Sequence, residues 1–184
     1  MNKKTIKHEE LVFKLKNKME TITFDKLLLK SVFCCMASDG KIDQREIALI
    51  KSMCQKSPLF VNFNFQEEIN TLVNEINKNG KEFISKYLNL LDKSSLIESE
   101  ELTLINFAIQ KIKADEQIEY AEIKFFKNIR HRLKITDEKI LTIYPDIEQF
   151  LEKDLITKSF LDLTSYDFLN DIKLLKIDLD EEKE

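Results

Sequence analysis

Glycine and proline, on which tight turns depend, occur only twice each among the 184 residues of this chain. Turn-dense β-sandwiches and glycine-looped nucleotide folds need many more of both. Leu, Ile, Lys and Glu are abundant instead, and these residues favour helices. Because 43% of the residues are apolar, a chain of this length can bury one sizeable core. We therefore predict an all-α fold.

Apolar residues recur at helical spacing along most of the chain. Two pairs of side chains predict capping boxes at helix starts, Asn64 with Glu67 and Ser95 with Glu98, and Thr136 predicts a further cap. The pair Asn79-Gly80 predicts a break between two helices. The expected helices span residues 8–19, 25–37, 43–55, 64–77, 81–91, 98–114, 119–133 and 136–143.

The phenylalanines at positions 60, 63 and 65 alternate as they would in a strand, but no partner strand is evident. We expect a loop that places aromatic rings in the core. Pro145 marks a boundary, which predicts a helical domain over 1–144 and a C-terminal extension over 145–184 with an acidic, disordered end.

The formal net charge of −4, with acids and lysines interspersed, predicts neither a nucleic-acid nor a membrane-surface partner. The charged start gives no signal peptide, and the most apolar stretch, 27–37, is too short to span a bilayer. We expect a cytoplasmic protein that does not cross a membrane. The odd set of Cys34, Cys35 and Cys54 lacks a Cys-x-x-Cys pair, so we expect buried packing residues.

The chain aligns on itself at an offset of 76 residues, which places Asp39 on Asp115. Acid then meets acid and apolar residue meets apolar residue on both sides of this pair. The matched pairs are Leu29 and Ile105, Val32 and Ala108, Phe33 and Ile109, Met36 and Ile112, Ile42 and Ile118, Asp43 and Glu119, Glu46 and Glu122, Ile47 and Ile123, and Ile50 and Phe126. A duplicated helix-turn-helix unit explains this pattern better than chance.

The turn of the first copy is similar to the second half of a calcium-binding EF-hand loop. The opening carboxylates of such a loop are missing, because the two positions hold Cys35 and Ala37 in the first copy and Lys111 and Lys113 in the second. We therefore do not expect an EF-hand.

The motif Ala37-Ser38-Asp39-Gly40-Lys41-Ile42-Asp43-Gln44-Arg45-Glu46 more closely resembles the repeat of the tellurite-resistance TerB family. In that pattern an apolar helix ends in Ala-x-Asp-Gly, followed by an aliphatic residue and by acid-x-x-Glu at the next helix. The second copy, Lys113-Ala114-Asp115-Glu116-Gln117-Ile118-Glu119-Tyr120-Ala121-Glu122, departs from it at Glu116, where the glycine is lost. The resemblance covers residues 25–143.

The resemblance implies a compact bundle of about seven or more helices, with acidic turns near one another and a role in binding a divalent cation. Oxygen ligands favour calcium or magnesium. It also implies a non-enzymatic binding module with protein partners in a bacterial stress-response or membrane-associated complex. The candidate metal ligands are Asp39, Asp43, Glu46, Asp115, Glu119 and Glu122.

Helix capping is the alternative function of these acids. Asp43 and Glu46 form a capping box, and acids in a first helical turn interact favourably with the helix dipole without any metal. Glu119 is a poor N-cap, so capping explains the second copy less well. The alternative to a metal-binding module is thus a purely structural protein-interaction adaptor.

Catalytic patterns are lacking in the sequence. Its two histidines, His8 and His131, form no metal-protease motif, and neither a nucleophile elbow nor a phosphate-binding glycine loop is present. A basic face on the helix 119–133 could contact phosphates, but we interpret it as a solvated surface. Lys124, Lys127, His131 and, just past the helix, Lys134 recur along this side, and Arg130 and Arg132 are adjacent to it.

Overall fold

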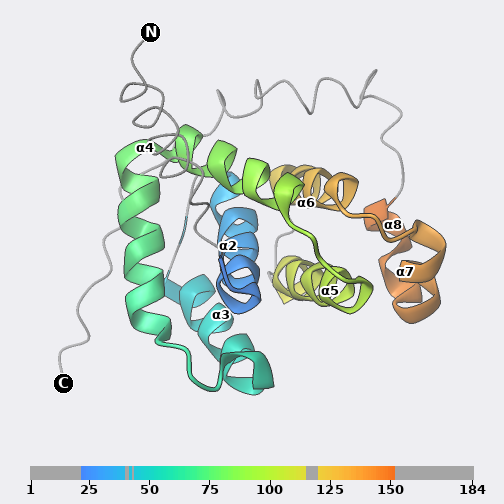
Figure 1. Cartoon of the computed structure of the whole chain (residues 1–184), viewed down its shortest axis with the longest axis horizontal. Coiled ribbons are helices and arrows are strands. Elements are labelled where there is room, and N and C mark those ends of the chain that lie inside the picture. Colours follow the sequence, from blue (N-terminus) through green and yellow to red (C-terminus); the bar gives the residue numbers. More distant parts are fainter. Residues whose placement is uncertain (1–21, 40–41, 43, 115–119, 152–184) are drawn as a thin grey trace, which may run out of the picture.

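The computed structural model describes residues 22–39, 42, 44–114 and 120–151 (Figure 1). Within these ranges all regular structure is helical, with seven α-helices and three short 3-10 helices, which confirms the predicted fold class. The elements in chain order are α2 (Phe24–Met36), η1 (Ala37–Asp39), α3 (Gln44–Lys56), η2 (Pro58–Phe60), α4 (Phe65–Lys93), α5 (Glu98–Ala114), α6 (Tyr120–Arg132), α7 (Asp137–Ile143), η3 (Pro145–Ile147) and α8 (Glu148–Leu151). The helix expected over 8–19 lies outside the described residues.

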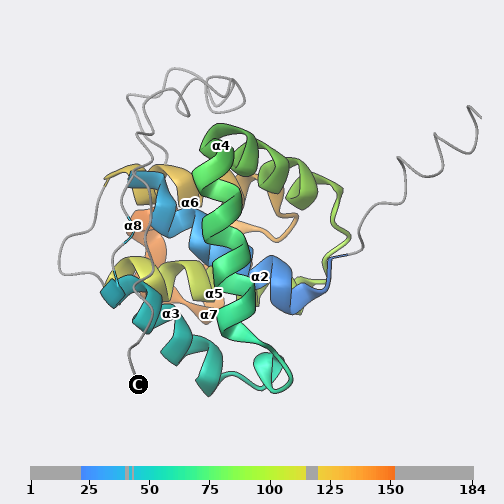
Figure 2. The ribbon, with the colours of Figure 1, turned by 90° about the vertical axis from the view of Figure 1, so that its left-hand side faces the viewer.

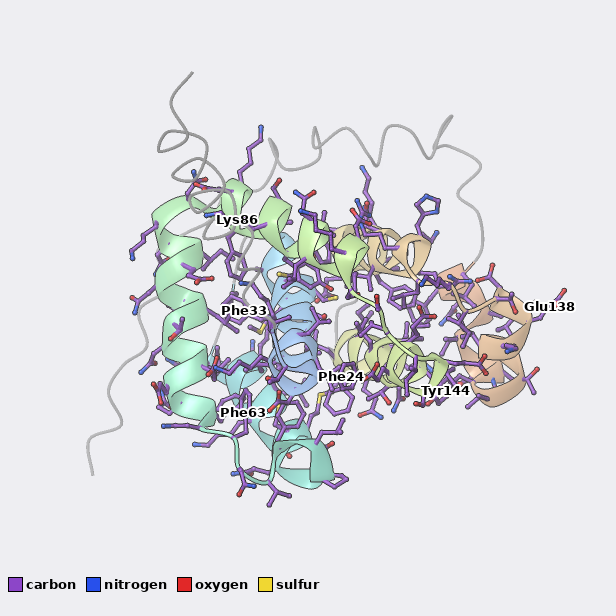
Figure 3. The ribbon with its side chains drawn as sticks, viewed as in Figure 1. Phe24, Phe33, Phe63, Lys86, Glu138 and Tyr144 are labelled. Carbon is purple, nitrogen blue, oxygen red and sulfur yellow. The ribbon has the colours of Figure 1, made fainter. Side chains whose placement is uncertain are left out.

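Helix α2 lies at the centre of the bundle, where it contacts α3, α4, α5 and α6 (Figures 1 and 2). Its residues from Leu27 to Leu29 and from Ser31 to Met36 are all buried, as expected for a helix covered on several sides. Phe33 lies between α2 and α4 (Figure 3), where its ring meets that of Phe83 edge to face at 6.0 Å between centroids. The centre of the core therefore belongs to the first repeat.

The two repeats appear in the structure at the predicted offset. Helix α6 begins and ends 76 residues after α3, since Gln44 corresponds to Tyr120 and Lys56 to Arg132. Helix α5 covers residues 100–112, which are equivalent to α2, and it extends two residues beyond them at each end. The most extensive helix-helix contact is that between α2 and α5, so the equivalent first helices of the two repeats pack on each other.

Helix α4 consists of two helical segments that meet at Asn79, where the backbone leaves the helical region with φ −162° and ψ 89°. The side-chain oxygen of Asn79 accepts a hydrogen bond from the backbone N–H of Glu82 at 3.1 Å, so Asn79 is the N-cap of the second segment. The two segments enclose a corner around α2 (Figure 1). The break predicted at Asn79-Gly80 is confirmed.

Two of the predicted helix caps are present. The oxygen of Asn64 accepts a hydrogen bond from the N–H of Glu67, and the hydroxyl of Thr136 accepts one from the N–H of Lys139. The capping box predicted for Ser95 with Glu98 is wrong by two residues. Helix α5 begins at Glu98, so the residue before it, Ile97, donates its backbone N–H to the side chain of Glu100 at 2.9 Å.

The loop after α3 places aromatic rings against the core as expected. Phe60, in η2, is buried and lies against Phe63 and Phe107, with ring centroids 5.0 Å and 6.1 Å away. At the other end of the bundle, Ile147 and Phe150 are also buried, and α8 contacts α6. The packed core therefore continues past the boundary that the sequence suggested at residue 144.

No helix among the described residues combines the length and apolar character that a bilayer crossing needs. All three cysteines are buried and unbridged, as the sequence predicted.

Removal of the Asn79 cap tests the origin of the bend in α4. We expect Asn79→Ala to lower the free energy of unfolding by about 1 kcal/mol, because the N–H of Glu82 loses its acceptor. Asn89→Ala, in the exposed interior of the second segment, is the matched control and should change it by less than about 0.5 kcal/mol. Urea unfolding measures both, and equal losses would contradict the capping role.

Candidate functional site at the junction of the two repeats

Lys111 is a buried cation in the last turn of α5, with only 1% of its side chain exposed. It ranks among the largest fully buried side chains of the described chain, together with Tyr87 and Phe33. Burial of an isolated ammonium group is costly, so such a lysine requires carboxylate partners.

Two carboxylates meet at the Lys111 ammonium, one from each repeat. Nζ of Lys111 lies 2.9 Å from Oε1 of Glu46 in α3, and it also forms an ion pair with Oε1 of Glu122 in α6. The side chain of Glu46 is 15% exposed and that of Glu122 is 1% exposed. Glu46 and Glu122 occupy the same position in the two repeats, so one lysine joins the equivalent glutamates.

These contacts determine the protonation state of Lys111. Burial lowers the pKa of its ammonium group, but hydrogen bonds to Glu122 and Glu46 and the charges of both carboxylates raise it by more. The pKa therefore lies above the ordinary value of 10.5, and Lys111 is charged at neutral pH.

The position equivalent to Lys111 in the first repeat is Cys35, which is also buried. Desolvation raises the pKa of its thiol to about 12, against a smaller lowering by the charge of Lys111 and together with a raising by that of Glu122. Cys35 is therefore a neutral thiol close to the ion pairs. In the contacts described, two equivalent carboxylates thus meet the ammonium of Lys111, whose equivalent in the first repeat is a thiol.

The predicted metal ligands are only partly placed by the structure. Glu46 and Glu122 both lie on the ammonium of Lys111. Asp39 ends η1, and η1 contacts α6, so the backbone of the first acidic turn adjoins the second repeat. Asp43, Asp115 and Glu119 lie outside the described residues.

The carboxylates of Glu46 and Glu122 are hard oxygen donors of the kind that calcium or magnesium takes. A divalent cation does not fit between them, because the ammonium of Lys111 forms ion pairs with both carboxylates and would repel a second cation. Among the described residues, no three acidic, histidine or cysteine side chains form a group suited to a metal ion. The acidic pair is therefore a lysine-binding pair in this structure.

A second buried charge, Glu101, was not among the predicted functional residues. Its carboxylate accepts backbone hydrogen bonds from Lys134 at 3.0 and 3.1 Å and from Ile135 at 2.7 Å. These bonds hold the turn between α6 and α7 against the first turn of α5. Glu101 therefore has a structural role.

A signal for both missed residues was present in the sequence. The buried face of α5 contains Leu104, Ile105 and Ala108, and Glu101 and Lys111 fall three residues before and three after this group. A charge in phase with an apolar helical face must be buried, and it then needs a partner. Which residues are the partners of Glu101 and Lys111 can be read only from the three-dimensional structure.

Two arginines adjacent to the basic face of α6 form contacts within the protein. The Nη2 atom of Arg130 lies 2.7 Å from Oδ1 of Asp137, and Arg132 lies against Asp92 in α4. Arg132 also donates a hydrogen bond from Nη1 to the carbonyl of Asn128 at 2.9 Å. These two arginines therefore link α6 to α7 and to α4.

Loss of the Lys111 charge should destabilise the fold. We expect Lys111→Met to lower the free energy of unfolding by about 3–5 kcal/mol, because two carboxylates lose their shared cation in the interior. Lys113→Met in the same helix is the matched control. Its lysine pairs with the exposed Asp146, and such a pair contributes at most about 1 kcal/mol. Chemical unfolding of both variants measures the difference, and similar losses would contradict the buried pair.

The raised pKa of Lys111 predicts a pH window for this contribution. A group whose pKa is raised by folding stabilises fully below its unfolded pKa and loses that effect as the pH rises through the folded value. The stability difference between the wild type and Lys111→Met should thus stay constant from neutral pH up to 10.5 and shrink above it. Urea unfolding across this range measures it, and a difference that already closes between neutrality and 10.5 would contradict the raised pKa.

No family model matches the chain, and neither does any curated protein or solved structure. The resemblance to the TerB repeat accordingly rests on the two quoted motifs.

Proposed function

We propose that the chain is a non-enzymatic, TerB-like helical adaptor that binds other proteins, and that the glutamates of its two repeats serve the fold. The convergence of Glu46 and Glu122 on Lys111 carries this proposal. It supports a structural role for these glutamates as partners of a buried lysine, whereas the capping box expected of Asp43 with Glu46 stays a prediction.

Structural use of the charged residues extends beyond this junction. Glu101 accepts hydrogen bonds from backbone N–H groups of the α6–α7 turn. Arg132 forms an ion pair with Asp92 in α4 and donates a hydrogen bond to a carbonyl of its own helix. Residues with these duties are poor candidates for acid-base chemistry, which needs a group free to exchange a proton with a substrate.

A non-enzymatic role is further supported by the cysteines. Burial raises the pKa of Cys34 well above its ordinary value and that of Cys54 to about 12, so both thiols are protonated at neutral pH. A nucleophilic cysteine requires the opposite shift.

Divalent-cation binding by the acidic turns is the second candidate function. The contact between η1 and α6 favours it, because Asp39, at the start of the first acidic turn, belongs to an element that lies next to the second repeat. In that case Asp39, Asp43, Asp115 and Glu119 would supply the ligands, with calcium or magnesium as the ion. The family resemblance implies that the chain acts in a bacterial stress-response or membrane-associated complex in the cytoplasm. This proposal is the same for both candidate functions.

Thermal unfolding with and without divalent cations separates the two candidates. For the structural adaptor, we expect the same Tm in calcium, in magnesium and in EDTA. A cation at about 100 times its Kd would add about 2.7 kcal/mol of stability, which raises the Tm of a chain of this size by roughly 5–10 °C. A rise of this size in the wild type that Asp39→Asn removes would favour metal binding instead.

A further inference from the structure

We propose that Asn79 is a site of spontaneous deamidation through a cyclic imide with Gly80, and that the contacts of Asn79 with Glu82 delay the reaction. The Asn79-Gly80 pair lies at the bend of α4, where the two helical segments form a corner around α2 (Figure 1). The modification changes the backbone or the charge at this corner. It therefore makes the bend of α4 sensitive to the age of the protein.

The sequence and the exposure of Asn79 favour reaction at this residue. The backbone nitrogen of the following residue must approach the side-chain amide closely, and glycine hinders this approach least because it has no Cβ. Asn79 is the one asparagine in the sequence that is followed by glycine, since the other glycine, Gly40, follows Asp39. It is exposed to water, and its backbone lies outside the helical region. Asn74 and Asn89 are also exposed, but they lie within the helical segments on either side.

The reaction needs water as its co-reactant. The backbone nitrogen of Gly80 bonds to Cγ of Asn79, the Cγ–Nδ2 bond breaks, and Nδ2 leaves as ammonia with the proton of the Gly80 N–H. Water then opens the cyclic imide at one of its two carbonyl carbons. Opening at Cγ yields aspartate, whereas opening at the main-chain carbonyl carbon yields isoaspartate, whose backbone runs through Cβ and Cγ. Isoaspartate therefore adds one carbon atom to the main chain at the bend.

Two hydrogen bonds hold the amide of Asn79 to Glu82. Oδ1 accepts one from the backbone N–H of Glu82 at 3.1 Å, and Nδ2 donates one to Oε2 of its carboxylate at 3.2 Å. A hydrogen bond from Lys86, and to a smaller extent the one from Asn79, lowers the pKa of this carboxyl, so the acceptor is charged at neutral pH. Departure of Nδ2 breaks its bond to the carboxylate, and rotation of the amide toward Gly80 weakens the other. Both contacts therefore oppose the reaction.

Peptide mapping by mass spectrometry, after incubation of the full chain in mildly alkaline buffer, measures the rate of conversion. We expect aspartate and isoaspartate to accumulate at Asn79 ahead of Asn74 and Asn89. Glu82→Ala should speed conversion roughly 2–5-fold, because it removes the acceptor of Nδ2 and retains the backbone N–H. Lys86→Ala is the matched control. It removes the other exposed partner of Glu82 but retains the contact with Asn79, so the rate should not change.

The product should weaken the bend. Isoaspartate loses both amide contacts with Glu82 and lengthens the main chain, so the converted protein should melt about 2–4 °C below the unmodified one, which is the effect of losing one helix cap. The added negative charge allows the converted chain to be separated by ion exchange before its thermal unfolding is measured.

Three results would overturn the proposal. Asn79 may convert no faster than Asn74 and Asn89, Glu82→Ala may convert no faster than Lys86→Ala, or the isolated isoaspartate form may melt with the unmodified protein. The first and third comparisons use the wild-type chain alone, so they remain decisive if Glu82→Ala does not fold.

Discussion

The contact of Lys111 with Glu46 and Glu122 is the interaction on which the arrangement of the two repeats depends. It joins α5 to α3 and to α6 at a place where water is almost fully excluded. Apolar packing between α2 and α5 is the most extensive helix-helix contact, but such packing is tolerant of small displacements. A buried ion pair does not tolerate such displacements, because the loss of a charged partner in the interior strongly destabilises the fold. The charges therefore define how the helices meet.

Duplication followed by divergence explains the distribution of roles in the bundle. Helices α3 and α6 retain the same length and the same glutamate, whereas the equivalent positions 35 and 111 have become a thiol and an ammonium group. The central helix α2 is buried along almost its whole length, while α5 retains Glu101 and Lys111 on its buried face. The second repeat therefore contributes the buried charges and the first contributes most of the apolar centre.

The helices and their ends were largely predictable because local physics determines them. Helical periodicity located α2 to α7, the side chains of Asn64 and Thr136 identified two helix starts, and the pair Asn79-Gly80 identified the break in α4. The capping box expected at Ser95 with Glu98 failed because two overlapping patterns compete there, and the glutamate at position 100 reaches Ile97. Local sequence alone does not decide between such neighbouring caps.

The candidate site was predictable only in part. The repeat identified Glu46 and Glu122 as an equivalent pair, and their approach to each other follows from the packing of the two hairpins. The role of Lys111 was hidden, because its partners are 65 and 11 residues away in the chain and only the fold brings them together. The like-charged acids suggested a free cation, and at Glu46 and Glu122 the structure shows the ammonium of Lys111 on both carboxylates.

A double-mutant cycle between Lys111→Met and each of Glu46→Gln and Glu122→Gln tests the shared ion pair most directly. Urea unfolding of the single and double variants yields the coupling energy of each pair. If one ammonium joins both repeats, both cycles should give coupling energies of about 1–3 kcal/mol. Additive effects in the cycle with Glu46, within about 0.3–0.5 kcal/mol, would show that Lys111 does not join the two repeats.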